Sequence, residues 1–92
     1  MKLTDRLTTS SDVVVRQVGG ETVLLDLASG TYFGLDPVGA RIWQAIEDDQ
    51  CSLGEACDLV LAEYDVMREQ LEADVLALAE QIVAHGLAAV ED

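Results

Sequence analysis

The chain has 92 residues, half of them apolar, and a formal net charge of −13. This length supports one small domain with a single core, and the longest apolar runs fall far short of the roughly 20 residues that a membrane-spanning helix needs. The opening MKLTDRLTTSSD has no apolar segment after its charges, which excludes a secretory signal of the usual form and predicts a cytoplasmic protein.

The negative charge lies almost entirely in the second half of the chain. Residues 1–46 hold five acids and four bases, whereas residues 47–92 hold thirteen acids and a single base, Arg68. Such a half would repel a phosphate backbone, so nucleic acid is not an expected partner. The acidic run is typical of a solvated helix surface, although a site for a basic partner would have the same composition.

Metal, cofactor and enzyme chemistry have little support in the residues. Cys51 and Cys57 have only His85 as another soft ligand, too few for a structural zinc site, so we expect no metal, no cofactor and two reduced thiols. His85 falls near a predicted helix end, where it would favour the helix dipole. The carboxylates are spread along helical surfaces and do not converge with a nucleophile, which predicts a protein that is not an enzyme.

The first part of the chain predicts strands. Residues 1–12 are polar and lack periodicity, so we expect a flexible N-terminal arm before a domain over residues 13–92. Two β-rich runs, residues 13–18 and 21–27, are joined by a Gly-Gly pair that suits a tight hairpin turn. Ala-Ser-Gly then precedes a short third strand over residues 31–35, which completes an antiparallel meander.

The rest of the chain predicts helices. Asp-Pro at residues 36–37 is typical of an N-cap and first turn, and the apolar spacing after it continues to about residue 47. Ser-Leu-Gly-Glu at residues 52–55 is a capping-box pattern in front of a second helix. The third and longest helix is expected over residues 66–85, with Gly86 as its left-handed cap and residues 87–90 returning as a short strand or extended tail.

Three strands followed by three helices predict a compact α+β domain in which an antiparallel sheet packs on the helices. The third strand has an edge without the Lys, Pro or bulge that usually blocks pairing with another chain. Such an edge is a template for an added strand, with main-chain hydrogen bonds for affinity and side-chain pockets for specificity.

The candidate peptide site is therefore this edge together with a wall formed by the third helix. Phe33 and Leu35 share one face of the strand and suit the core, while Tyr32 shares the other face with Gly34 and is the better candidate for a contact. The apolar wall residues suit the core equally well. The full set is Thr31, Tyr32, Phe33, Gly34, Leu35, Leu71, Asp74, Val75 and Leu78.

The segment VLLDLASGTYFGLDPVGARIWQAI, residues 23–46, resembles the PqqD-like family, named for a protein of pyrroloquinoline quinone biosynthesis. The resemblance continues through the capped second helix, residues 71–75 and residues 85–87, and covers about residues 13–90. It implies a winged helix-turn-helix-like domain that binds the leader of a ribosomally synthesised and modified peptide as an extra strand, without catalysis. In that family the leader pairs with the third strand and leans on the third helix, which are the segments that hold the nine candidate residues.

The resemblance also narrows the expected partners. The sequence lacks the Arg-rich opening and Pro-Glu-Gly segment of the quinone-pathway protein, and is more similar to free-standing recognition proteins of lasso-peptide pathways. The partner implied there is a transglutaminase-like leader peptidase, whereas other PqqD-like domains serve radical S-adenosylmethionine enzymes. Two other functions fit the same elements: a winged-helix DNA-binding regulator, which the lack of Lys and Arg in residues 69–85 disfavours, and an adaptor that forms a homodimer through its edge strand.

Overall fold

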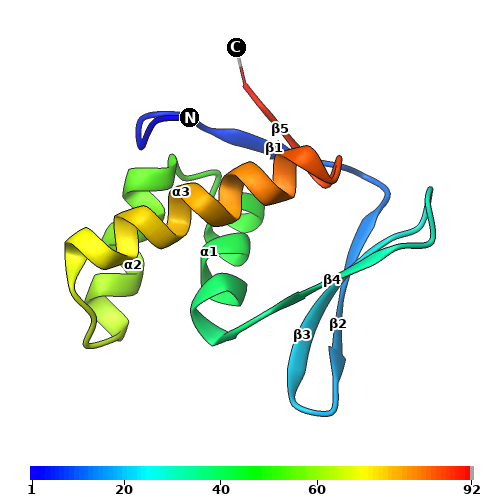
Figure 1. Ribbon diagram of the computed structural model, residues 1–92, viewed down its shortest axis with the longest axis horizontal. Coiled ribbons are helices and arrows are strands. Elements are labelled where there is room, and N and C mark those ends of the chain that lie inside the picture. The colour runs from blue at the N-terminus through cyan, green and yellow to red at the C-terminus, as the bar shows by residue number, and fades with distance from the viewer. Residues whose placement is uncertain (92) are drawn as a thin grey trace.

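The computed structural model describes residues 1–91, in which a small sheet lies beside three helices (Figure 1). An antiparallel sheet has the order β2 (Val13–Val18), β3 (Glu21–Asp26), β4 (Tyr32–Leu35). The helices α1 (Pro37–Asp48), α2 (Leu53–Glu63) and α3 (Arg68–Ala84) follow it. Two further strands, β1 (Leu7–Thr9) and β5 (Ala88–Val90), form a separate ribbon. The predicted α+β class is confirmed, with the sheet as the wing of a winged helix-turn-helix-like domain.

The two turns of the sheet have different chemistry. Gly19 and Gly20 have φ values of 58° and 86°, so the β2–β3 hairpin uses the left-handed backbone that glycine adopts at low cost. The β3–β4 turn is instead organised by Asp26, which is only 9% exposed. Its carboxylate accepts hydrogen bonds from the Ala28 backbone N–H at 3.1 Å and the Ser29 hydroxyl at 2.8 Å. This turn fixes where β4 begins.

The predicted cap at the start of α1 is present. Asp36 is the N-cap, its Oδ1 accepts a hydrogen bond from the Gly39 N–H at 2.6 Å, and Pro37 occupies the first helical position. Because β4 ends at Leu35, the sheet edge passes directly into the first turn of α1. The two elements therefore lie side by side where a groove opens.

The third helix differs slightly from its predicted bounds. It begins at Arg68 rather than residue 66, after the extended residue Met67, whose side chain makes no capping hydrogen bond. At the other end, Gly86 has a φ of 73° and donates to the Val83 carbonyl at 3.0 Å, while the Leu87 N–H donates to the Ile82 carbonyl at 3.0 Å. This pair of bonds is a Schellman motif, and it turns the chain into the predicted C-terminal strand.

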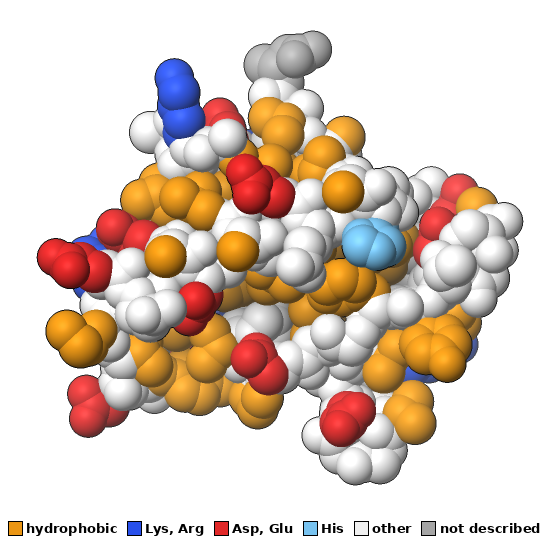
Figure 2. Space-filling model, in the orientation of Figure 1, with side chains coloured by type: hydrophobic (Ala, Val, Ile, Leu, Met, Phe, Trp, Pro, Cys, Tyr) orange, Lys and Arg blue, Asp and Glu red, His pale blue; other side chains and the backbone are white. Residues whose placement is uncertain are grey.

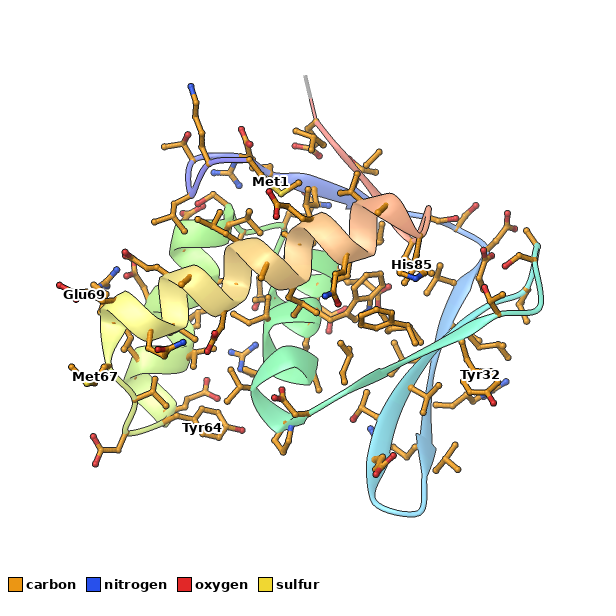
Figure 3. All side chains as sticks on the ribbon, in the orientation of Figure 1. Met1, Tyr32, Tyr64, Met67, Glu69 and His85 are labelled. Carbon is orange, nitrogen blue, oxygen red and sulfur yellow. The ribbon has the colours of Figure 1, made fainter. Side chains whose placement is uncertain are left out.

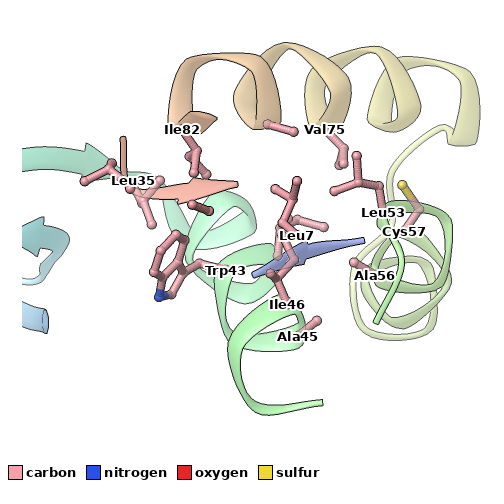
Figure 4. Packing of buried hydrophobic residues seen from close by; sticks show 14 of the residues in the cluster. Leu7, Leu35, Trp43, Ala45, Ile46, Leu53, Ala56, Cys57, Val75 and Ile82 are labelled. Atoms are coloured by element: carbon pink, nitrogen blue, oxygen red, sulfur yellow. The ribbon is translucent and has the colours of Figure 1, made fainter. Parts of the chain in front are cut away.

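The core lies between the inner face of the sheet and the three helices (Figure 4). Trp43 of α1 is the largest fully buried side chain, and Leu24 of β3 is 0% exposed. The amphipathic spacing of the helices explains this arrangement, because each one directs an apolar stripe to the same interior. The other fully buried side chains of this set are Ile42, Leu53, Cys57, Val60, Val75, Ile82 and Leu87.

The expectation of a flexible arm over residues 1–12 requires correction at β1. Leu7 is only 4% exposed in the core, and β1 pairs antiparallel with β5. The carbonyl oxygens of Leu3 and Asp5 accept hydrogen bonds from the first two N–H groups of α2, at 2.7 and 3.0 Å. These donors would otherwise have no partner within the helix, so this part of the chain completes the α2 terminus.

Candidate functional site

The site begins at the open edge of β4. Strand β4 pairs with β3 on one side, and no strand among the described residues pairs with its other side. The Asp26 N–H donates to the Thr31 carbonyl at 2.9 Å, so Asp26 and Thr31 form a hydrogen-bonded pair. Along an antiparallel ladder, hydrogen-bonded pairs alternate with pairs that are not hydrogen-bonded. Phe33 therefore bonds to β3, whereas Tyr32 and Gly34 direct their backbone N–H and C=O groups toward the open edge.

A groove of 360 Å³ lies beside this edge. One side of the groove is formed by β4 and the first turns of α1. The other side is the face of α3 on which the lining residues recur every three or four positions. In the space-filling view, apolar side chains line the depression between these elements (Figure 2). A peptide strand added to β4 would thus lie over an apolar groove, which could receive its alternate side chains.

The floor of the groove is part of the core. Leu35, Leu71 and Val75 are at most 7% exposed, so they both stabilise the fold and shape the groove. Gly39 leaves room for the N-cap side chain, since a Cβ at this position would lie 3.1 Å from the Asp36 Oδ1, whereas its distance of 3.5 Å from the Leu78 Cδ2 of α3 would be an ordinary contact. The core and contact interpretations of these apolar residues are therefore compatible.

The rim of the groove is polar. On α3, the Gln70 Nε2 donates a hydrogen bond to the Asp74 Oδ1 at 2.9 Å, which holds this carboxylate over the groove. The ring of Phe33 meets the ring of His85 edge to face, with centroids 5.4 Å apart. Met67 and His85 lie at opposite ends of α3 (Figure 3).

The structure brings seven of the nine predicted residues around this groove and leaves two outside it. Thr31 belongs to the turn before β4, where its hydroxyl lies 2.7 Å from that of Ser29. Tyr32 directs a 76% exposed side chain to the other face of the sheet, so only its backbone faces the edge. The seven residues around the groove are Phe33, Gly34, Leu35, Leu71, Asp74, Val75 and Leu78.

Eight other residues that line the groove are absent from the set predicted from the sequence. Gln70 and Gln81 share the helical stripe of Leu71, Asp74 and Leu78, so the period alone would have placed them there. The groove residues of α1 could have been predicted only from their position directly after the edge strand, which is a weaker signal. The eight residues are Asp36, Val38, Gly39, Ile42, Val66, Met67, Gln70 and Gln81.

The remaining reactive groups lie apart from the groove. Burial raises the pKa of the Cys57 thiol and, with nearby carboxylates, that of Cys51, so both remain protonated at neutral pH. No three His, Cys, Asp or Glu side chains within residues 1–91 are placed to hold a metal ion. None of the helices in this part of the chain is both long and apolar enough to cross a membrane.

Comparison with known proteins agrees with this geometry. The family model described as coenzyme PQQ synthesis protein D (PqqD) matches residues 21–88. A solved chain described as TbiB1 in complex with the TbiA(β) leader peptide is 37% identical, with a TM-score of 0.76, covering 88% of this chain and 93% of that chain. A lasso peptide synthetase B1 complexed with the leader peptide is 30% identical, with a TM-score of 0.78 and coverages of 91% and 98%. Among curated proteins, none matches closely enough in sequence to count as a relative. The chain belongs to the PqqD family.

Proposed function

We propose that this chain binds the leader segment of a ribosomally made precursor peptide and presents it to a separate processing enzyme. The observation that carries the proposal is the unpaired edge of β4 beside the apolar groove against α3. The leader would add as a fourth strand, with its alternate side chains directed into the groove. The two similar solved chains, each described as a complex with a leader peptide, support this function.

The backbone of β4 would supply part of the affinity. Tyr32 and Gly34 each offer one N–H and one C=O to an added strand, and each hydrogen bond contributes about 1 kcal/mol. Two or three apolar side chains in the groove would add roughly 1.5–3 kcal/mol each. Ordering the peptide costs several kcal/mol, so affinity near micromolar is expected.

The role proposed is binding without catalysis. Holding the leader beside an enzyme raises the effective concentration of the attached core peptide, so binding alone accelerates processing. We favour lasso-peptide biosynthesis in the cytoplasm, with a transglutaminase-like leader peptidase as the enzyme and a radical S-adenosylmethionine enzyme as the alternative. The description of one similar chain as a lasso peptide synthetase B1 supports this order of preference.

Substitution of Gly34 tests the proposed edge. Gly34→Pro removes an N–H that points away from β3, so the sheet should persist while leader affinity falls about tenfold or more, by loss of a hydrogen bond and steric blocking. Gly34→Ala is the matched control, because a Cβ there meets nothing within 4 Å and the N–H remains. Binding is measured by fluorescence polarisation of a labelled leader peptide from the neighbouring precursor gene.

The location is then measured by backbone amide chemical shifts during the same titration. Saturable shifts confined to β4 and the groove face of α3 are expected. Equal affinity of the Pro and Ala variants, or shifts spread over other surfaces, would reject the edge as the binding site. Dimerisation of the peptide-free protein through β4 would instead support the self-pairing adaptor.

A further inference from the structure

The sheet has a second face that no helix covers. Because strand residues alternate between faces, the buried Leu24 and Leu35 define the inner face, and their neighbours in sequence define the outer one. The outer sheet face consists of Val14, Arg16, Val18, Glu21, Val23, Leu25, Tyr32 and Gly34. Val18 is 60% exposed and Tyr32 is 76% exposed, and Figure 3 shows Tyr32 at the side of the sheet away from the helices.

The charge of this face contrasts with the rest of the molecule. Among residues 1–91, salt bridges engage Arg6, Arg41 and Arg68 with carboxylates of the helices, whereas Arg16 has no carboxylate within salt-bridge distance. Arg16 lies between two valines along β2 and opposite Val23 of β3. Glu21 lies opposite Val18 on the same face but forms no salt bridge with Arg16. A chain of net charge −13 thus has one largely apolar face that carries no excess of acid. Its complement is an apolar surface that carries a carboxylate.

The outer sheet face is continuous with the proposed leader site. A leader strand on β4 would extend the same sheet, and the leader side chains that do not enter the groove would lie beside Tyr32 on this face. A protein docked there would contact both this chain and the bound leader. A second copy of this chain is a poor fit, because it would bring two molecules of net charge −13 together.

We propose that the outer sheet face is the docking surface for the leader peptidase, which would meet it with an apolar patch that carries a carboxylate. This inference rests on the proposed leader-binding function. It separates two surfaces of one sheet: the edge of β4 holds the substrate, and the face around Arg16 holds the enzyme.

The test compares two charge reversals that alter net charge equally. Arg16→Glu changes the centre of the outer sheet face, and Lys2→Glu changes the other cation that makes no salt bridge within residues 1–91. Affinity for the purified peptidase encoded with this chain is measured by biolayer interferometry in the presence of saturating leader peptide. Arg16→Glu should weaken peptidase binding about tenfold or more, and Lys2→Glu should leave it within about twofold of the unsubstituted protein.

A second variant and a second readout make the outcome decisive. Val18→Asp alters an exposed apolar residue of the same face and should also weaken peptidase binding, while leader affinity stays unchanged in all three variants. Unchanged peptidase binding by both face variants, or equal weakening by Lys2→Glu, would overturn the docking surface. A peptide-free dimer that Arg16→Glu dissociates would overturn it in favour of self-association. Failure of the unsubstituted protein to bind leader would instead reject the proposed function.

Discussion

At the scale of single residues, the start of α2 shows how a few polar contacts order two distant segments. The Ser52 hydroxyl accepts from the Glu55 N–H at 3.2 Å, and the Glu55 carboxylate accepts from the Ser52 N–H at 2.9 Å. Arg6 adds a salt bridge to the same carboxylate at 3.0 Å. The hydrogen bonds from Ser52, followed by the charge of Arg6, lower the pKa of Glu55 below its ordinary value of 4.5.

This lowered pKa predicts a pH-dependent contribution to stability. Because the folded state favours the carboxylate, the stabilisation by Glu55 is complete above its unfolded pKa and is lost as pH falls through the lower folded pKa. Glu55→Gln should therefore melt below the unsubstituted protein at neutral pH, and the difference should narrow as pH falls below the ordinary pKa of 4.5. Circular dichroism melting curves measure it. The control is Glu80→Gln at an exposed α3 position, and a gap that widens in acid would contradict the assignment.

Single residues of the candidate site also differ in whether the sequence could predict their positions. Alternation along β4 was sufficient to place Phe33 and Leu35 inward and Tyr32 outward, because strand geometry depends only on neighbours. It could not place Val66 and Met67 at the groove, since they owe that position to the late start of α3 at Arg68. Such a boundary depends on tertiary packing, which a helical period does not encode.

At the scale of elements, the three helices and the main sheet were predictable because their signals are local. Caps, turn glycines and apolar spacing all lie within a few residues of the elements they specify. Strand β1 has no such signal: it has three residues, two of them Thr, and its partner β5 lies at the other end of the chain. Its order comes from pairing and from the burial of Leu7, both of which depend on the folded domain.

A substitution in β1 measures how strongly this strand is held. Leu7→Ala removes a side chain that is 4% exposed in the core and should lower the free energy of unfolding by about 2–5 kcal/mol. Thr8→Ala is the control on the same strand, because Thr8 is exposed and its hydroxyl makes one hydrogen bond, to Glu91, so about 1 kcal/mol or less is expected. Urea denaturation measures both. Equal, small effects would mean that the arm is loosely held after all.

At the scale of the whole molecule, charge decides which partners are compatible. Acidic side chains are spread over the helical part of the face in Figure 2, and α3 has no base after Arg68, which is paired with Asp58 and Glu72. A winged-helix DNA reader would need Lys and Arg on this helix. The winged-helix shape of this domain therefore does not imply the DNA binding that this fold often performs in regulators.

The same excess charge predicts a dependence of stability on salt. The side chains of the four salt bridges are between 20% and 62% exposed, and solvent-screened pairs of this kind contribute little, whereas a net charge of −13 repels itself in the folded state. Raising NaCl from about 10 mM to about 500 mM should therefore raise the melting temperature by screening this repulsion. Differential scanning calorimetry at constant pH measures the effect. A melting temperature that falls with salt would mean that the salt bridges outweigh the repulsion.

The β1–β5 ribbon brings the two ends of the described chain together. Leu7 lies opposite Val90, and neither strand contributes a residue to the groove between β4 and α3. A fluorophore, an affinity tag or a fused enzyme attached at either end would leave from this ribbon (Figure 1), which lines no part of the groove beside β4. The domain is therefore suited to use as a module: it can be tethered by one end or inserted into a loop of another protein through both.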